Sequence, residues 1–256
     1  MIESNATPVR LRAVTEGSIG TTAFFRNRVL FNTLLGKMKS DGQEHYNILF
    51  HACSVGAEVY SLLISYLTGG YDKHFTLALS ATDREQEFLD YAMLGCYPKI
   101  VLSSMTAAEK FFFQVVNQNA TIDHELRNKI SFLPASNFID YSSNDPFDVV
   151  FLLNALIYVP AELQAKTLDG IARYNEGLLV TTAFHADSIM EDLARNSYRP
   201  FLKNIKAIHE AWTDRRITVS GDELRPGIFA KWSLPKFSQV DDFEFKYCAI
   251  FEKYNR

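Results

Sequence analysis

The stretch His51–Ser61, HACSVGAEVYS, follows the apolar run Ile48–Phe50 and leads directly into Leu62–Leu67. An apolar run, a short turn and a helical apolar pattern are typical of a strand–loop–helix unit that holds a nucleotide-like ligand. The turn has one glycine, Gly56, where a dinucleotide fingerprint places three. The loop Cys53–Gly56 therefore suits a small zwitterion better than a pyrophosphate, which needs closer approach to the backbone.

The composition is that of a globular chain, with 256 residues of which 47% are hydrophobic and 22% charged. A net charge of −4 provides no basic field for nucleic acid. The sequence has no apolar run of the roughly 18 residues that span a membrane. The three cysteines and six histidines lack the spacing of metal sites. We expect a cytoplasmic protein with reduced thiols, no metal, and neither nucleic acid nor membrane as partner.

Short apolar runs alternate with helical patterns over most of the chain. The predicted strands are Asn47–Cys53, Phe75–Thr82, Lys129–Pro134, Phe147–Leu153 and Gly177–Ala183. The predicted helices are Thr21–Lys39, Ala57–Leu67, Arg84–Leu94, Thr106–Val116 and Ala161–Tyr174. Apolar strands separated by helices indicate an α/β fold with a mainly parallel sheet covered on both faces.

The last part of the chain has a different pattern. Asp187–Trp212 is predicted to be rich in helix. The alternating segments Gly227–Ser233 and Glu244–Phe251 then predict an antiparallel hairpin. With this hairpin at its edge, the mostly parallel sheet has seven strands.

Two acidic residues lie where ligands bind in such sheets, beyond the carboxyl ends of the strands. Glu58 can complement a positively charged ligand, or it can simply stabilise the N-terminus of its helix. Asp83 can accept two hydrogen bonds from ribose hydroxyls, or it can cap the helix that follows.

The predicted strand Phe147–Leu153 delivers Asn154 and Tyr158 to the same edge of the sheet. A tyrosine at this position can be a packed aromatic or a residue that contacts the reacting groups. His51 or His185 could serve as a proton acceptor for a hydroxyl group, although a core histidine is the simpler interpretation of His51.

Five stretches in order resemble the CheR family, methyltransferases that esterify glutamates of chemotaxis receptors. HACSVGAEVYSLLI is similar to CSTGEEPYSLA, LSATDREQEFLDYAMLGCYPK to a segment that opens ATDID, and FDVVFLLNALIYV to FDxIFCRNVLIYF. TTAFFRN is similar to TxFFR, and LRNKISFLPASNFID also resembles its family counterpart. The similarity runs collinearly from about Thr21 to Tyr174.

The resemblance implies a class I methyltransferase with a Rossmann-like fold and S-adenosylmethionine as cofactor. The residues at family cofactor positions are Thr22, Arg26, Glu58, Asp83, Asn137 and Phe138. Cys53, Gly56 and Asn154 complete the expected cofactor site, and Arg26 and Tyr158 are expected beside the transferred methyl group. Residues 1–40 would form an arm and helix that close this site, and residues 41–256 the methyltransferase domain.

Several positions depart from the family pattern. Ala57 and Val59 replace a glutamate and a proline, and Leu153 replaces the arginine of CRN. Only about twenty residues precede TTAFFRN, and Thr181–Ala186 replaces the sequence usual in the family. We therefore expect an O-methyltransferase with a small or carboxylate-bearing acceptor, and not one that acts on intact chemotaxis receptors. The alternatives are a protein-glutamate methyltransferase and a non-catalytic module that binds S-adenosylmethionine; the oligomeric state stays open.

Four basic residues recur in the helix-rich stretch: Arg195, Arg199, Lys203 and Lys206. They could select an anionic acceptor, or they could form an ordinary solvated face.

Overall fold

The computed structural model describes residues 20–185, 189–212, 216–220, 223–227, 236–239 and 243–254. A seven-stranded sheet forms its centre, in the order β10-β13-β9-β8-β2-β3-β7. The strands are β2 (His45–Phe50), β3 (Thr76–Ala81), β7 (Ile130–Phe132), β8 (Phe147–Leu152), β9 (Asn175–Thr181), β10 (Tyr198–Pro200) and β13 (Ile250–Lys253). The pairs among β7, β3, β2, β8 and β9 are parallel, whereas β13 is antiparallel to both neighbours. The expected mostly parallel seven-stranded α/β fold is confirmed.

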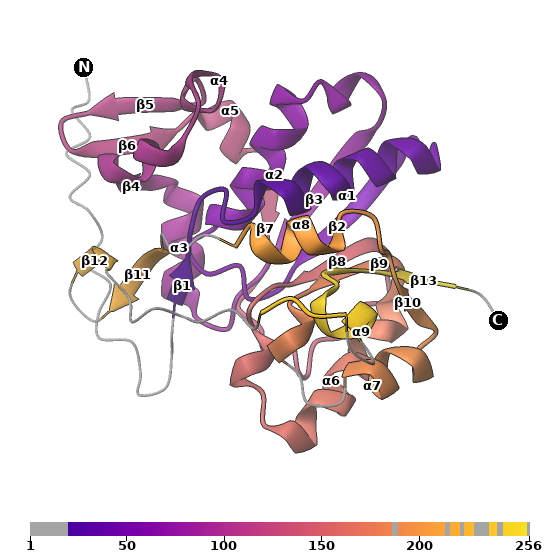
Figure 1. Ribbon diagram of the computed structural model, residues 1–256. Coiled ribbons are helices and arrows are strands. Elements are labelled where there is room, and N and C mark those ends of the chain that lie inside the picture. The colour runs from indigo at the N-terminus through magenta and orange to yellow at the C-terminus, as the bar shows by residue number, and fades with distance from the viewer. Residues whose placement is uncertain are drawn as a thin grey trace.

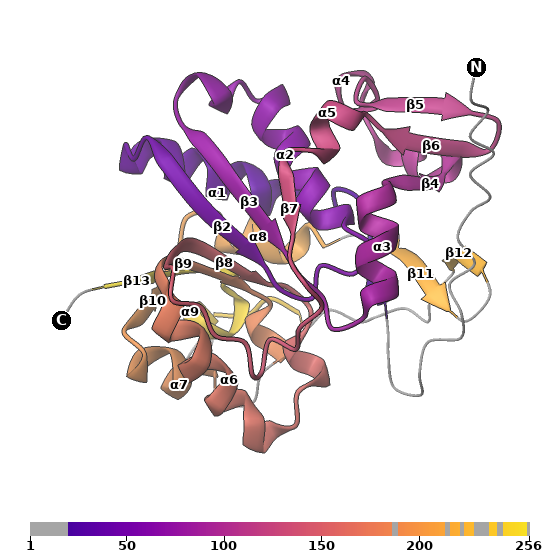
Figure 2. The same cartoon turned by 180° about the vertical axis from the view of Figure 1, so that it is seen from behind.

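Helices cover both faces of this sheet (Figures 1 and 2). The longer helices are α1 (Arg28–Asp41), α2 (Ala57–Thr68), α3 (Gln86–Leu94), α6 (Ala161–Tyr174) and α7 (Ile189–Arg195), and the shorter ones α8 (Ile205–Glu210) and α9 (Phe243–Tyr247). Alternate residues of β2 face the two cores, because side chains alternate along a strand. Ile48 and Phe50 pack with α1 and α2, whereas Leu49 packs with α6 and α7.

The C-terminal antiparallel strand has a partner that the sequence did not predict. Strand β13 lies between β9 and β10, and β10 comes from the stretch predicted to be rich in helix. The predicted strand Glu244–Phe251 is instead helix α9 followed by the first residues of β13. Tyr247 of this helix packs against His209 and Phe237, and these tertiary contacts override the alternating pattern. The predicted strand Gly227–Ser233 lies outside the described residues, apart from Gly227.

A second sheet takes up the last part of the helix predicted over 106–116. It has the order β4-β6-β5, formed by β4 (Cys96–Pro98), β5 (Phe113–Val116) and β6 (Asn119–Ile122). Thr106 begins a helix with a capping box, but α4 (Ala107–Lys110) ends after one turn. Phe113, Val115 and Val116 then pair with β6, as suits β-branched and aromatic residues. Short elements around this sheet are α5 (His124–Arg127) and the 3-10 helix η2 (Lys99–Ser104).

A third sheet joins distant parts of the chain. Strand β1 (Gly20–Thr22) pairs with β11 (Arg216–Ser220), which forms a hairpin with β12 (Glu223–Gly227). The predicted helix Thr21–Lys39 therefore starts later than expected, at Arg28. Asn27 sets this start, because its side chain accepts a hydrogen bond from the backbone N–H of Leu30.

The remaining regular elements are 3-10 helices: η1 (Tyr71–Lys73), η3 (Leu156–Tyr158) and η4 (Ala183–His185). In the part of the chain that the structure describes, the helices are too short or too polar to cross a membrane.

Gly56 is required by the tight loop between β2 and α2. Its φ is +79°, and an added Cβ would lie 2.9 Å from Cβ of Ala92. We expect Gly56→Ala to destabilise the protein by about 2 kcal/mol or more, because a left-handed residue would meet a clash. Gly170→Ala is the control. Gly170 lies within α6, and a Cβ added there would meet no neighbouring atom within 4 Å, so this substitution should stabilise the protein by about 0.5–1 kcal/mol. Urea unfolding measures both, and equal stabilities would contradict this role of Gly56.

Candidate active site

The loop after β2 is held against the end of β3. Backbone N–H of Cys53 donates to the carbonyl oxygen of Thr82 over 3.1 Å, and N–H of Ser54 donates to Oδ2 of Asp83 over 2.7 Å. Ala52 and Ser54 have φ values of 49° and 51°, a strained conformation for residues other than glycine. Backbone strain of this kind gathers at functional sites. The loop therefore has the character of a binding loop.

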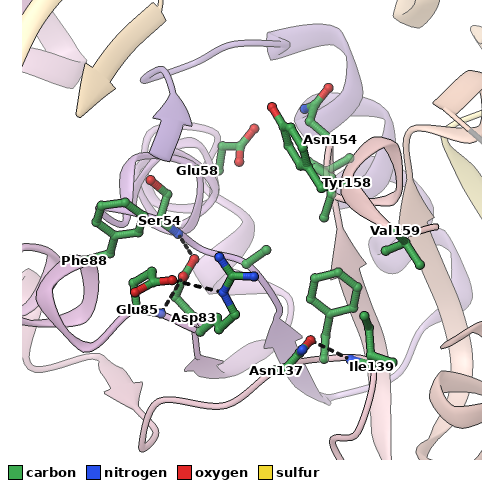
Figure 3. A pocket seen from close by; sticks show the side chains of 15 residues that line it. Ser54, Glu58, Asp83, Glu85, Phe88, Asn137, Ile139, Asn154, Tyr158 and Val159 are labelled. Atoms are coloured by element: carbon green, nitrogen blue, oxygen red, sulfur yellow. Dashed lines mark hydrogen bonds and ion pairs between the residues drawn. The ribbon is translucent and has the colours of Figure 1, made fainter. Parts of the chain in front are cut away.

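An open pocket lies beyond the carboxyl ends of β2, β3 and β8 (Figure 3). Its lining residues are Ala52, Ser54, Glu58, Asp83, Arg84, Glu85, Phe88, Asn137, Phe138, Ile139, Leu153, Asn154, Ala155, Tyr158 and Val159. Glu58, Asn154 and Tyr158 are at one end, whereas Asp83, Glu85 and Asn137 are at the other. Its mixed apolar and polar lining suits a small-molecule ligand.

Asp83 is oriented by two backbone groups. Oδ2 accepts the hydrogen bond from Ser54, and Oδ1 accepts one from the backbone N–H of Glu85 over 3.0 Å. Burial raises the pKa of Asp83, and these hydrogen bonds oppose part of that effect. Helix α3 begins at Gln86 with Glu85 at its N-cap position, so Asp83 holds the preceding turn. A carboxylate has about four lone-pair sites, which leaves capacity to bind a ligand.

Glu58 forms a buried ion pair with Arg26. Nη1 of Arg26 lies 3.3 Å from Oε1 of Glu58, and the two residues are 4% and 6% exposed. Burial raises the pKa of Glu58, while the charge and hydrogen bond of Arg26 act to lower it. Arg26 is therefore a buried side chain and not a solvated helix residue. Arg26 fixes a carboxylate that faces the pocket.

The other end of the pocket is formed after β8. Asn154 has a φ of 55°, and its backbone N–H donates to Oγ1 of Thr182 over 3.0 Å. Tyr158 follows in η3 and is 56% exposed, so the alternative of a packed aromatic does not fit. Ile157 beside it is 49% exposed. The tyrosine stands at an open lip of the pocket.

Several buried polar side-chain atoms have no hydrogen-bond partner in the part of the chain that the structure describes, and three of them belong to the predicted site or to the pocket lining. These three are Oγ1 of Thr22, Oγ of Ser54 and Nδ2 of Asn154. Ser54 and Asn154 line the pocket, and leaving such groups unpaired costs free energy. A polar ligand in this pocket would satisfy them. These donors, with the carboxylates of Glu58 and Asp83, fit a ligand that carries hydroxyls, an ammonium group and a carboxylate.

The structure brings together most of the residues predicted for the site. Glu58, Asp83, Asn137, Phe138, Asn154 and Tyr158 line the pocket. Thr22, Arg26, Cys53 and Gly56 lie outside its lining, and their contact with a cofactor stays a prediction. Burial raises the pKa of the Cys53 thiol, so the thiol is neutral and its role here is packing.

Sequence reasoning missed several lining residues, among them Ser54, Arg84, Glu85, Phe88 and Ile139. The available signal was proximity in sequence to Gly56, Asp83 and Phe138. Asn137 has a turn-forming role as well, because its Oδ1 accepts from the backbone N–H of Ile139 over 3.1 Å.

His51 has the environment of a core histidine. Its Nε2 lies 2.9 Å from the hydroxyl oxygen of Tyr174, and burial lowers its pKa to about 3. It does not line the pocket, so the proton-acceptor hypothesis finds no support there. The side chain of His185 lies outside the described residues.

The basic residues predicted to select an anionic acceptor also lie away from the pocket. Arg195 pairs with Asp169, Arg199 with Glu252 and Lys206 with Glu210. The solvated-face interpretation therefore fits these three residues.

Comparison with known families matches residues 20–189 to the sequence model described as CheR methyltransferase, SAM binding domain. A chemotaxis protein methyltransferase of Vibrio parahaemolyticus is 25% identical over 173 residues, which cover 64% of this chain and 63% of the relative. Chemotaxis protein methyltransferase 2 of Pseudomonas aeruginosa is 28% identical over 195 residues, 70% of this chain and 69% of the relative. The chain thus spans somewhat less than two thirds of the length of the Vibrio relative.

Among solved structures, magnesium protoporphyrin IX methyltransferase from Synechocystis with bound SAM aligns over 68% of this chain and 70% of its own. The TM-score is 0.42 and the sequence identity 13%.

Proposed function

This chain belongs to the CheR methyltransferase family, and from that membership we propose that it is an S-adenosylmethionine-dependent O-methyltransferase that acts on a side-chain carboxylate of a protein. The observation that carries the acceptor class is the open lip at Tyr158. Ile157 and Tyr158 are about half exposed there, which leaves room for a segment of another protein. An enclosed cavity would suit a small molecule better.

The chemistry at the lip also favours a carboxylate. A hydroxyl acceptor needs a general base, whereas a carboxylate is already ionised at neutral pH. Histidine and lysine are absent from the pocket lining that the structure describes. The carboxylates of this lining already have partners: Glu58 pairs with Arg26, Asp83 accepts from two backbone N–H groups, and Glu85 pairs with Arg84. The carboxylate part of the sequence prediction is therefore kept in this proposal, and the small-molecule part is not. The Vibrio and Pseudomonas relatives compared above bear the name chemotaxis protein methyltransferase, in agreement with this choice.

The proposed roles divide the pocket between its two ends. Asp83 accepts hydrogen bonds from the ribose hydroxyls, and Asn137 and Phe138 flank the base. Glu58, held by Arg26, attracts the ammonium group. The cofactor supplies an electrophilic methyl group on a sulfonium centre. Tyr158 holds the acceptor oxygen in line with it, because in-line displacement depends mainly on positioning.

The N-terminal residues complete this arrangement in our proposal. Residues before about 40, with Thr22 and Arg26, close the site. Two contacts support this role. Backbone N–H of Phe25 donates to Oγ of Ser61 in α2 over 2.8 Å, and Arg26 pairs with Glu58 in the same helix.

Methyl transfer to defined protein acceptors tests the proposal. The purified chain is incubated with S-adenosylmethionine labelled in the methyl group and with receptor fragments or other glutamate-rich proteins. We expect protein-bound label that mild base releases as volatile methanol, since carboxyl methyl esters are base-labile. Base-stable label in the protein would contradict a carboxylate acceptor. A parallel incubation with intact chemotaxis receptors decides whether these receptors are acceptors, which the sequence led us not to expect.

Cofactor affinity should depend on pH through the two buried carboxylates. Burial raises the pKa of Glu58 and of Asp83, so each becomes protonated at a higher pH than an exposed carboxylate. Affinity for S-adenosylhomocysteine should therefore be full above these raised pKa values and fall as the pH drops through them. In Glu58→Gln, the affinity measured by calorimetry should depend less on pH than it does in the wild type. Asp169→Asn, away from the pocket, is the control, and a profile unchanged in Glu58→Gln would contradict the role of Glu58.

A further inference from the structure

Arg84 is an unexpected cation in the pocket. It follows Asp83 directly at the end of β3 and lines the pocket together with Phe88, Phe138 and Ile139. The segment SATDRE places arginine where the similar family segment ATDID has isoleucine. This chain therefore puts a planar, permanently charged group among apolar side chains.

Glu85 holds the guanidinium group at the rim of the pocket. Nε of Arg84 donates to Oε1 of Glu85 over 3.0 Å, and the two side chains are 55% and 27% exposed. Glu85 is itself tied to the loop, because its backbone N–H donates to Oδ1 of Asp83. The pair therefore restricts the orientation of a flexible side chain.

The position of Arg84 directly after Asp83 suggests which part of the cofactor Arg84 contacts. If Asp83 binds the ribose, the base attached to that ribose lies close to Asp83, and Arg84, the next residue, also lines the pocket. The end of the pocket opposite Glu58 and Tyr158 contains Asp83, Glu85 and Asn137 (Figure 3). A purine there presents a flat π-face, and arginine guanidinium groups stack on such faces.

We propose that Arg84 stacks on the adenine ring of the cofactor, and that Glu85 orients the guanidinium group for this contact. The proposal rests on the cofactor placement proposed above. It assigns Arg84 to binding the base rather than to holding the acceptor carboxylate. The half-exposed side chain would shield the base from solvent.

Calorimetry with two ligands and three substitutions tests this contact. The ligands are S-adenosylhomocysteine and 5′-methylthioadenosine, which share the adenosine part but differ in the amino-acid part. We expect Arg84→Ala to lower the affinity for both by about 2- to 30-fold, the scale of one cation–π contact. Arg84→Lys should lose part of this affinity, because an ammonium group has no planar face to stack on the ring, whereas Arg84→Tyr should restore affinity. Arg173→Ala on α6, outside the pocket, is the control.

The outcomes separate this proposal from the proposed function. Unchanged affinity in Arg84→Ala, with normal binding by the wild type, overturns the stacking contact alone. If Arg84→Lys binds both ligands with the affinity of the wild type, Arg84 acts through its charge alone, and the stacking contact is also overturned. Absence of binding by the wild-type chain overturns both proposals together. The role of Glu85 predicts that Glu85→Ala has little further effect once Arg84 is alanine.

Discussion

Asp83→Ala is expected to lower the affinity for S-adenosylhomocysteine by about 30- to 1,000-fold. The carboxylate is oriented by the backbone N–H groups of Ser54 and Glu85, so its remaining lone pairs face the pocket in a fixed geometry. Two charge-assisted hydrogen bonds to ribose hydroxyls are worth on the order of 2–4 kcal/mol together. Calorimetric titration measures the loss directly.

Because of these two hydrogen bonds, Asp83 also stabilises the turn before α3. The thermal stability of the variant must therefore be measured together with its affinity. Asp140→Ala provides a matched control, because Asp140 is exposed, pairs with Lys166 and lies outside the pocket lining. Its affinity should equal that of the wild type. If a folded Asp83→Ala variant also binds with unchanged affinity, Asp83 serves only the turn before α3.

Tyr158→Phe is expected to keep cofactor affinity and to lose turnover by roughly 10- to 1,000-fold, the scale of one positioning or electrostatic contact. The hydroxyl stands at the lip of the pocket, where it can hold the acceptor oxygen in line with the methyl group. Removing an interaction made mainly in the transition state lowers kcat rather than ground-state binding. Single-turnover methyl transfer, with affinity for S-adenosylhomocysteine measured separately, distinguishes the two effects.

Tyr254→Phe is the control for this substitution. Tyr254 is also exposed and lies beside Ser197, outside the pocket lining, so its loss of a hydroxyl should leave turnover unchanged. Full activity in Tyr158→Phe would show that the hydroxyl group of Tyr158 has no role in methyl transfer.

The parallel core of the fold could be predicted because its signals are local. Strands β2, β3, β8 and β9 are apolar runs, and α2 and α6 have strong helical periodicity. The edge of the sheet could not be predicted in the same way. Strands β10 and β13 have three and four residues, too few to establish an alternating pattern. Their pairing depends on contacts between residues about fifty positions apart.

The site residues also fall into those with a local sequence signal and those without one. Asp83 and Glu58 could be predicted because acidic residues at strand ends and helix starts have a known chemistry. Arg26 was predicted only through the family resemblance, since its ion pair joins residues 32 positions apart. The left-handed backbone of Ala52 and Ser54 left no sequence signal, because alanine and serine rarely adopt it, whereas asparagine, as at Asn154, adopts it more often. Strain imposed by tertiary packing is not encoded locally.

A crystal structure of the chain with S-adenosylhomocysteine tests most directly where the cofactor binds. We expect the ribose hydroxyls within hydrogen-bonding distance of Asp83, the base between Arg84 and the Asn137–Phe138 segment, and the ammonium group beside Glu58. The sulfur atom should face Tyr158 at the open lip. Electron density for the ligand outside this pocket, or in it with the adenine end beside Tyr158, would contradict the proposed site.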